Sequence, residues 1–259
     1  MIISQASKKR IAGLFSRHAR FYDSKAEVQK ELLQKLGKRV SMLINEGEKW
    51  CDIGCGTGKL LDYTGPLPEK STIICLDLAF GPLHIARGPG RNAPVVNGDV
   101  EYPPIRDSSL DGVITSSMLQ WITDPQKTLN TMISKLKTTH PIIFSVFTRG
   151  SFGELCAVRN SQGLSVSTWF PSDEDLVRLL KNAGAEIGDL QEFSSIRYFD
   201  SAFSALKSLN AVGGTAVSGP LLKRGQLADL CRQYEARFGT DAGIPVTYKA
   251  LLGYARRIK

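Results

Sequence analysis

Three glycines alternate with other residues in the segment Trp50–Gly58, directly after a short apolar run. Because glycine lacks a Cβ and readily adopts positive φ, Gly54, Gly56 and Gly58 allow the backbone to turn sharply out of a strand and approach a ligand. We expect that ligand to meet the N-terminus of the next helix, where free N–H groups and the helix dipole favour a carboxylate or phosphate. The segment therefore predicts a nucleotide-binding loop, and a tight turn without a ligand is the alternative.

The spacing of these glycines indicates which nucleotide binds. In the dinucleotide fingerprint G-x-G-x-x-G/A the last position is small, but here it is Lys59, which disfavours NAD. The pattern D-x-G-x-G-x-G instead resembles the first motif of class I S-adenosylmethionine-dependent methyltransferases, in which the amino-acid end of the cofactor lies over the loop. The resemblance implies cofactor contacts from Asp52, Gly54, Cys55, Gly56 and Gly58.

Two acidic residues follow the next two expected strands. The apolar run 71–78 is too short for a helix and contains Asp77, about twenty positions after the glycines. A carboxylate there can accept hydrogen bonds from the ribose hydroxyls, each worth about 1.5–3 kcal/mol, so Asp77 and Leu78 are expected at the cofactor; a helix N-cap is the alternative for Asp77. After the third strand, the resemblance implies that Asp99 accepts from the adenine amino group and that the Val100 backbone serves the ring. An Asx turn is the alternative for Asp99.

A fourth strand over 111–115 opens onto the segment 116–122. Its side chains are expected to line the reactive end of the cofactor, so Ser116, Gln120 and Trp121 are assigned to the cofactor site. Gln120 and Trp121 also suit the wall of an acyl pocket. An ordinary core aromatic is the alternative for Trp121.

The elements that must position these loops alternate along the chain. Strands are expected near 49–53, 72–77, 94–97, 111–115 and 141–147, and helices over 58–64, 81–87 and 126–137. This alternation predicts an α/β fold with a parallel sheet covered by helices on both faces. A helix over 173–183 and strands near 186–199 and 245–257 complete the seven-stranded, Rossmann-like sheet that the resemblance implies, with an antiparallel last strand.

We expect a single domain over 1–259, because a chain of 259 residues with 42% hydrophobic residues can bury a large core. The core is assigned to 46–149, 171–199 and 243–259, an N-terminal helical cap to 1–45, and lid insertions to 150–170 and 200–242. Within the second insertion, helical spacing over 201–211 and 223–238 places Leu206, Leu209, Leu227, Leu230 and Tyr234 on apolar faces, separated by a turn at Gly213–Thr215.

Composition bounds the environment of the protein. Met1–Arg10 lacks the apolar core of a signal peptide, and no run of eighteen uncharged apolar residues occurs, so we expect a soluble, cytoplasmic protein. The five cysteines are expected to be reduced. No metal site is predicted, because His84 is the only nearby partner for the cysteines and its spacing fits no structural zinc pattern.

The net charge of +8 is carried in part by two clusters near the ends of the chain. These are Lys8, Lys9, Arg10, Arg17 and Arg20 at one end and Arg256, Arg257 and Lys259 at the other. The charge suits an acidic protein or a nucleic acid, with a solvated basic surface as the alternative. Because no basic tract is interleaved with aromatics, we expect no nucleic-acid partner, and we expect a monomer without membrane contact.

A set of motifs in one order identifies a narrower family than the glycine loop does. The motifs are Phe15-x5-Phe21-Tyr22-Asp23-x2-Ala26-x2-Gln29, Leu76-Asp77-Leu78, Ser116-x3-Gln120-Trp121, Ser145-Val146-Phe147, Leu209-Asn210-Ala211-Val212-Gly213 and Thr247-Tyr248. From about residue 8 to residue 257 the chain resembles the malonyl-acyl-carrier-protein O-methyltransferases of biotin synthesis. Ala79-Phe80 replaces the usual Ser-Pro and His84 a longer apolar residue, which puts details of adenosine packing in question.

The resemblance implies that S-adenosylmethionine donates a methyl group to the free carboxylate of a malonyl thioester on an acidic acyl carrier protein. A carboxylate with a pKa near 4 is ionised at neutral pH and needs no general base, so catalysis should depend on positioning. One alternative is a methyltransferase for another small carboxylic acid or a quinone-type ring. A second alternative is a non-catalytic cofactor-binding scaffold for an acidic protein.

Three residues are candidates for holding the malonyl carboxylate. An arginine fork matches a carboxylate geometrically, and Arg149 follows the fifth strand at the sheet edge where ligands bind. Arg197 is the second candidate, because its strand leads into the lid; a surface ion pair is the alternative for both arginines. Tyr22 lies at a helix junction, where its phenol can bond a carboxylate or gate solvent, with core packing as the alternative.

Overall fold

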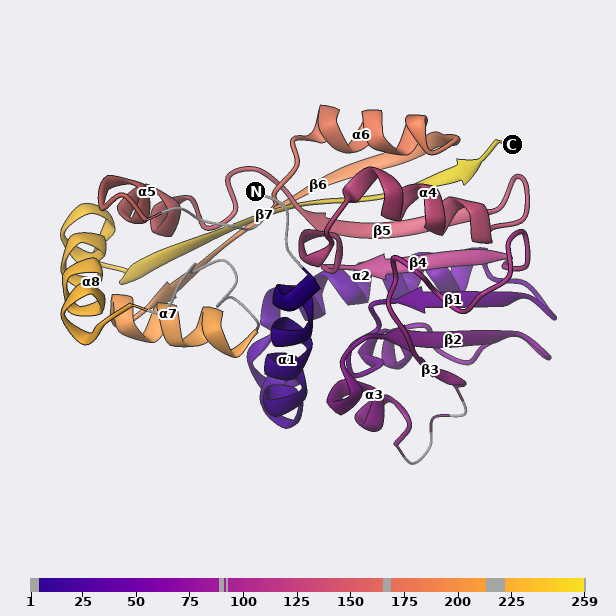
Figure 1. Cartoon of the computed structure of the whole chain (residues 1–259), viewed down its shortest axis with the longest axis horizontal. Helices are drawn as coiled ribbons and strands as arrows, with labels where there is room; N and C mark the ends of the chain where they lie inside the picture. Colours follow the sequence, from indigo (N-terminus) through magenta and orange to yellow (C-terminus); the bar gives the residue numbers. More distant parts are fainter. Residues whose placement is uncertain (1–4, 89–90, 92, 165–168, 213–221, 259) are drawn as a thin grey trace.

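The computed structural model describes residues 5–88, 91, 93–164, 169–212 and 222–258. Its seven strands form one sheet in the order β3-β2-β1-β4-β5-β7-β6, which runs through the middle of the molecule (Figure 1). The strands are β1 (Lys49–Ile53), β2 (Thr72–Asp77), β3 (Val95–Asn97), β4 (Gly112–Ser116), β5 (Pro141–Phe147), β6 (Ala185–Phe199) and β7 (Ile244–Arg257). Strands β1 to β5 pair in parallel, and β7 pairs antiparallel with β5 and β6. The predicted α/β sheet with an antiparallel last strand is confirmed.

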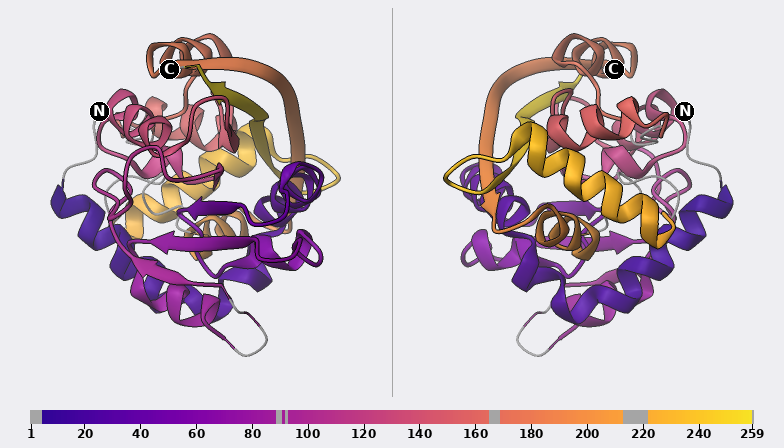
Figure 2. Two further views of the ribbon diagram at one scale, coloured as in Figure 1. Left: turned by 90° about the vertical axis from the view of Figure 1, so that its right-hand side faces the viewer. Right: turned by 90° about the vertical axis from the view of Figure 1, so that its left-hand side faces the viewer.

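Helices cover both faces of the sheet (Figure 1 and Figure 2). On one face, α2 (Glu27–Leu43) places Leu32 and Leu36 against Trp50 of β1 in a single buried cluster. On the other face, α4 (Pro125–Lys135) and α6 (Asp173–Asn182) place Met132 and Leu180 in a second buried cluster. Because the parallel strands are covered twice, their sequences read as nearly continuous apolar runs rather than alternating ones.

Side-chain caps define where several helices begin. The Oδ1 atom of Asp124 accepts from the Lys127 amide at 3.0 Å, and Pro125 takes the first position of α4. Ser172 and Asp175 exchange the two hydrogen bonds of a capping box at the start of α6, and Ser201 caps α7 (Ala202–Ala211). Such a cap typically contributes about 1 kcal/mol, so these starts are determined locally.

Strands β6 and β7 extend beyond the parallel part of the sheet, at the left of Figure 1. Helices α5 (Gly153–Ser161), α7 and α8 (Arg224–Phe238) pack on this extension, and Figure 2 shows α8 running across that end of the molecule. The predicted helices over 201–211 and 223–238 are confirmed, with Leu209, Leu230 and Tyr234 buried in the cluster that also contains α2 side chains. The turn Gly213–Thr215 lies outside the described residues.

The helix expected over 58–64 is wrong, because Lys59–Tyr63 forms only a short 3-10 turn, η1. The segment is bracketed by Gly58 (φ 70°) and Gly65 (φ 65°), and the positive φ of both glycines leaves no room for a longer helix. So short a turn lacks the aligned dipoles of an α-helix, and the expectation that a ligand meets a helix N-terminus here fails with it.

The remaining helices surround the ends of the parallel strands. Helix α1 (Gln5–Lys25) crosses the carboxyl ends of the strands beside α3 (Phe80–Ala86), and η2 (Leu119–Trp121) follows β4. The described helices include none that is both long and apolar enough to cross a bilayer. The five cysteines are free thiols, and burial raises the pKa of Cys51 in β1.

The contact between Gly112 and Trp50 provides a test of this packing. A Cβ on Gly112 would lie 2.1 Å from Cδ2 of Trp50, whose ring is buried between α2 and the sheet. We expect Gly112→Ala to destabilise the protein by about 1–3 kcal/mol, because the ring cannot move without opening the core. Gly13→Ala is the matched control: no other atom lies within 4 Å of its Cβ, so it should stabilise α1 by about 0.5–1 kcal/mol. Denaturant unfolding in which Gly112→Ala is not destabilised would contradict the packing.

Candidate functional site

Three adjoining cavities lie at the carboxyl ends of β1, β2 and β4, where open α/β sheets bind their ligands. The first, about 130 Å³, lies between α1 and the ends of β2 and β3; the third, about 50 Å³, lies beside the glycine loop. The second, about 20 Å³, has room for a single water, so a larger ligand needs its walls to move. Tyr22 lines all three cavities, and Trp121 lines the first and second.

Asp77 organises the glycine loop. Its Oδ2 atom accepts from the Gly56 amide at 2.8 Å, and its Oδ1 atom accepts from the Ala79 amide at 2.7 Å. Asp77 thus joins the loop after β1 to the start of α3, although Ala79 rather than Asp77 is the N-cap of that helix. Gly56 has φ 54°, and no atom would lie within 4 Å of a Cβ there, so the loop leaves open space at the cavity. Each carboxylate oxygen keeps a further lone pair that a ligand hydroxyl can use.

The buried carboxyl group of Asp52 and the half-buried one of Asp77 face this loop. Asp52 is 2% exposed, and burial, followed by the charge of Asp77, raises the pKa of Asp52 to about 8. Burial also raises the pKa of Asp77, against the opposing effect of the amides of Ala79 and Gly56. In the described parts of the chain no lysine or arginine pairs with either carboxyl group. A cationic ligand would therefore stabilise their ionised forms.

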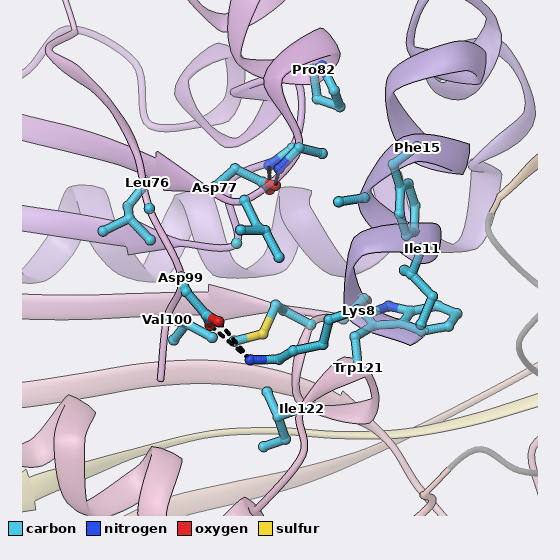
Figure 3. Close-up of a pocket in the computed structure, with 18 of the residues that line it drawn as sticks. Lys8, Ile11, Phe15, Leu76, Asp77, Pro82, Asp99, Val100, Trp121 and Ile122 are labelled. Atoms are coloured by element: carbon cyan, nitrogen blue, oxygen red, sulfur yellow. Dashed lines mark hydrogen bonds and ion pairs between the residues drawn. The ribbon is translucent and has the colours of Figure 1, made fainter. Parts of the chain in front are cut away.

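Lys8 closes the opposite side of the first cavity. Figure 3 shows this side chain reaching from α1 toward Asp99. Its Nζ atom lies 2.8 Å from both carboxylate oxygens of Asp99 and 3.0 Å from Oε1 of Glu101. Glu101 in turn accepts from the Thr123 amide at 2.6 Å, which connects the loops after β3 and β4. The expectation that Lys8 shares an exposed basic face is wrong, because this ammonium is 4% exposed and paired.

Asp99 forms an Asx turn, which was the alternative to its predicted contact with adenine. Its Oδ1 atom accepts from the Glu101 amide two residues on, at 3.0 Å, which is an Asx turn. The side chain nevertheless lines the first cavity together with Val100 and Leu78. Both geometries are compatible, because a carboxylate has four lone-pair positions.

Aromatic side chains separate the first cavity from the second. The ring of Phe15 lies 5.8 Å from that of Tyr22 and 5.6 Å from that of Trp121, in edge-on geometry. Burial raises the pKa of Tyr22 well above its ordinary value, so its phenol stays protonated and can donate a hydrogen bond at neutral pH. The second cavity also contains the side chains of Gln29, Ser117, Gln120, Phe147, Phe152 and Val212.

The second cavity holds polar atoms that lack partners. Ser117 Oγ and Gln120 Oε1 are buried without a hydrogen bond to any residue that the structure describes. Ser117 also adopts a positive φ of 51°, an uncommon backbone conformation for a non-glycine residue. Buried polar groups are seldom left unpaired, and each such group costs about 1–3 kcal/mol, which indicates a cavity suited to a polar ligand.

The residues assigned to the cofactor lie around all three cavities. Asp52 and Cys55 line the third cavity, Ser116 lines the first and third, and Gln120 lines the second rather than the first. Gly54 and Gly56 line the first and third, whereas Gly58 lines none of the three and serves to turn the loop.

The two arginines proposed for substrate binding lie outside these cavities. Arg149 is 74% exposed, and its Nη2 atom lies 3.6 Å from Oδ2 of Asp175. Arg197 pairs with Glu31 and, through Nε at 3.9 Å, with Glu27. Both arginines thus form surface ion pairs, which were the alternative to their predicted role in binding the malonyl carboxylate.

Sequence reasoning missed Lys8 and Phe152 as cavity residues, whereas Ser117 belongs to the segment that was expected to line the cofactor. Lys8 carried no distinguishing signal, because its neighbours Lys9 and Arg10 are equally basic and both exposed. Phe152 precedes α5 with φ 55°, a conformation that no feature of its sequence predicts. Gln29, by contrast, belongs to a motif on which the family resemblance depends and could have been found from it.

Comparisons with known proteins agree with this arrangement. A family described as a methyltransferase domain matches residues 51–140. Similar proteins named malonyl-[acyl-carrier protein] O-methyltransferase come from Geobacter sulfurreducens (28% identical, covering 96% of this chain and 99% of that protein), Serratia marcescens (29%, 97% and 96%) and Priestia megaterium (28%, 97% and 97%).

Solved structures share the fold at lower identity. The YcgJ protein of Bacillus subtilis superposes with a TM-score of 0.62 at 15% identity, covering 86% of this chain and 98% of that one. The [4+2]-cyclase SpnF superposes with a TM-score of 0.56 at 18% identity, covering 87% of this chain and 80% of that one. Because a cyclase has this architecture, the fold alone does not decide the reaction.

The raised pKa of Asp52 predicts how stability depends on pH. The folded state holds this proton more tightly than the unfolded chain, in which the pKa is about 3.9, so the contribution of Asp52 is largest below pH 4. It should be lost at up to about 1.4 kcal/mol per pH unit as the pH rises from about 4 to about 8. Thermal unfolding between pH 5 and 8 should therefore show a flatter profile for Asp52→Asn than for the wild type. The exposed Asp241→Asn is the control, and parallel profiles for all three proteins would refute the shift.

Proposed function

We propose that this chain, a class I S-adenosylmethionine-dependent methyltransferase, transfers the methyl group of its cofactor to the free carboxylate of a malonyl thioester on an acyl carrier protein. Relatives of that name match nearly the whole chain, including the insertions that build the second cavity. The product is a methyl ester, in which the negative charge of the malonyl group is masked.

The composition of the second cavity carries this proposal. Its described lining residues include no aspartate, glutamate, histidine, lysine or cysteine, and its one titratable group, Tyr22, has a raised pKa. A hydroxyl or amine acceptor would need a base to remove its proton, whereas a carboxylate is already ionised at neutral pH. The absence of a base among these residues therefore favours a carboxylate acceptor.

The first and third cavities suit the cofactor. S-adenosylmethionine supplies a methyl group on a positively charged sulfur, and the ionised forms of the buried Asp52 and the half-buried Asp77 offer the complementary charge. We assign the amino-acid end to the third cavity beside Asp52, the ribose to Asp77, and the adenine to the region of Asp99 and Val100.

We assign two neutral donors to the malonyl carboxylate. The Tyr22 phenol and the Ser117 hydroxyl line the second cavity and also face the two cavities assigned to the cofactor. Hydrogen bonds from neutral donors orient a carboxylate while leaving it more nucleophilic than a bidentate arginine would. Arg149 and Arg197 therefore give way to Tyr22 as the residue most directly placed for this role.

Catalysis then consists mainly of alignment and exclusion of water. Phe15, Tyr22 and Trp121 form an aromatic wall around the junction of the cavities. Holding the carboxylate in line with the methyl group gives effective molarities of about 10⁵–10⁸ M. Excluding water removes the hydration shell that would otherwise stabilise the carboxylate and slow its attack.

The proposed reaction can be tested directly by mass spectrometry. Malonyl-acyl carrier protein incubated with the protein and S-adenosylmethionine should gain one methyl group on the malonyl carboxylate. Acetyl-acyl carrier protein is the matched control, because it has the same carrier and thioester but no free carboxylate. Asp77→Ala should lose the reaction through loss of the ordered glycine loop. Cofactor binding without methylation of the malonyl carrier would refute the substrate, and a panel of small acids and quinone-type rings would then identify another.

Tyr22→Phe distinguishes the phenol from the arginine as the carboxylate ligand. Loss of a hydrogen bond to a charged group costs about 1.5–3 kcal/mol, so kcat should fall roughly 10- to 100-fold. The Kd for S-adenosylmethionine should change by less than about twofold, because the ring and its packing remain. Arg149→Ala, by comparison, should leave kcat within about twofold. A large loss of kcat in Arg149→Ala and a small one in Tyr22→Phe would instead identify Arg149 as the ligand of the carboxylate.

A further inference from the structure

An outer groove of about 470 Å³ lies on the face of the molecule formed by the end of α1, the start of α2, the end of β6 and α7. Helix α7 lies beside α1 in Figure 1. The residues that matter for the inference are Lys25, Gln29, Arg197, Tyr198, Lys207 and Ala211.

The floor of this groove is the wall of the second cavity. Gln29 lines both spaces. Leu209 of α7 and the following Val212 line the cavity, whereas Ser208 and Ala211 of α7 line the groove. On the other side, the ring of Tyr248 lines the groove and lies 5.0 Å from the ring of Phe152. The two spaces therefore share the Gln29 side chain and adjoin along α7.

The groove is lined by more positive than negative charge. Lys25 and Lys207 are exposed and form no ion pair with any residue in the described ranges, whereas Arg197 is shared with Glu27 and Glu31. Glu27 is the one carboxylate among the described lining residues. The aromatic ring of Tyr198, 50% exposed, lies at the same place. An anionic partner with a narrow apolar projection fits this combination.

We propose that this groove admits the thioester arm of the acyl carrier protein, with Lys25 and Lys207 receiving the acidic carrier and the phosphate that joins the arm to it. The inference rests on the proposed function and adds to it a docking surface and a direction of entry. The arm would pass between α7 and Gln29, so that the malonyl carboxylate reaches Tyr22 from the side opposite to the cofactor.

The charge of the groove can be reversed without touching the cavities. In the double variant Lys25→Glu, Lys207→Glu, the Kd for malonyl-acyl carrier protein, measured by fluorescence anisotropy, should rise at least about tenfold, and added salt should reduce the difference. Lys181→Glu on α6 carries the same kind of change on an exposed helix far along the sheet and should bind like the wild type. Unchanged Kd for S-adenosylmethionine would show that the double variant is folded.

Blocking the groove separates passage of the arm from docking of the carrier. Ala211→Trp should lower kcat/KM at least about tenfold both for malonyl-acyl carrier protein and for malonyl-pantetheine, which lacks the carrier and its phosphate. The double lysine variant should lower kcat/KM for the carrier substrate alone.

Two results would overturn the inference while leaving the proposed function intact. One is methylation of malonyl-acyl carrier protein by the double lysine variant with wild-type Kd and kcat/KM. The other is wild-type turnover of both substrates by Ala211→Trp. Failure of the wild type to methylate a malonyl carrier that it binds would instead refute the proposed reaction and leave the docking surface standing.

Discussion

The site depends on the two hydrogen bonds that the Asp77 carboxylate accepts from Gly56 and Ala79. They join the loop after β1 to the start of α3, and they hold a half-buried carboxyl group close enough to Asp52 for its charge to raise the pKa of Asp52. In water-excluded surroundings the ionised form of either group is costly unless a positive charge approaches it. The same geometry that shapes the glycine loop therefore creates a preference for a cationic ligand, and S-adenosylmethionine is such a ligand.

Helix α1 and the segments that follow β5 and β6 build the rest of the site around that loop. Helix α1 is held over the first cavity by the buried ammonium of Lys8, and it supplies Tyr22 to the junction of all three cavities. Helix α7 separates the second cavity from the outer groove. A carboxylate acceptor needs no base, so this architecture can consist of donors, aromatic walls and an entrance, without a catalytic acid or base.

The fold was predictable, and so was the gathering of the residues assigned to the cofactor at one edge of the sheet, because topology determines both. Asp77 and Ser116 end parallel strands and Asp99 follows one, and parallel strands bring their carboxyl ends to one edge whatever the surrounding helices do. The sequence did not reveal that the segment after the glycine loop forms a 3-10 turn rather than an α-helix, because this depends on the positive φ of Gly65, which shortens the segment. Arg149 also follows the end of a strand, yet its long side chain extends toward Asp175 at the surface. This direction was not predictable, because it depends on where α6 packs. The burial of Lys8 likewise depends on how α1 crosses the sheet, which no local pattern encodes.

Proton release on cofactor binding tests the central claim most directly. If the pKa of Asp52 is about 8 in the free protein, this group is largely protonated at pH 7, and a bound cation should favour its ionised form. Calorimetric titration with S-adenosylmethionine at pH 7, in buffers of different ionisation enthalpy, should show about one more proton released by the wild type than by Asp52→Asn. The same proton balance in both proteins would contradict the account, because Asp52 would then hold no proton for the cofactor to displace.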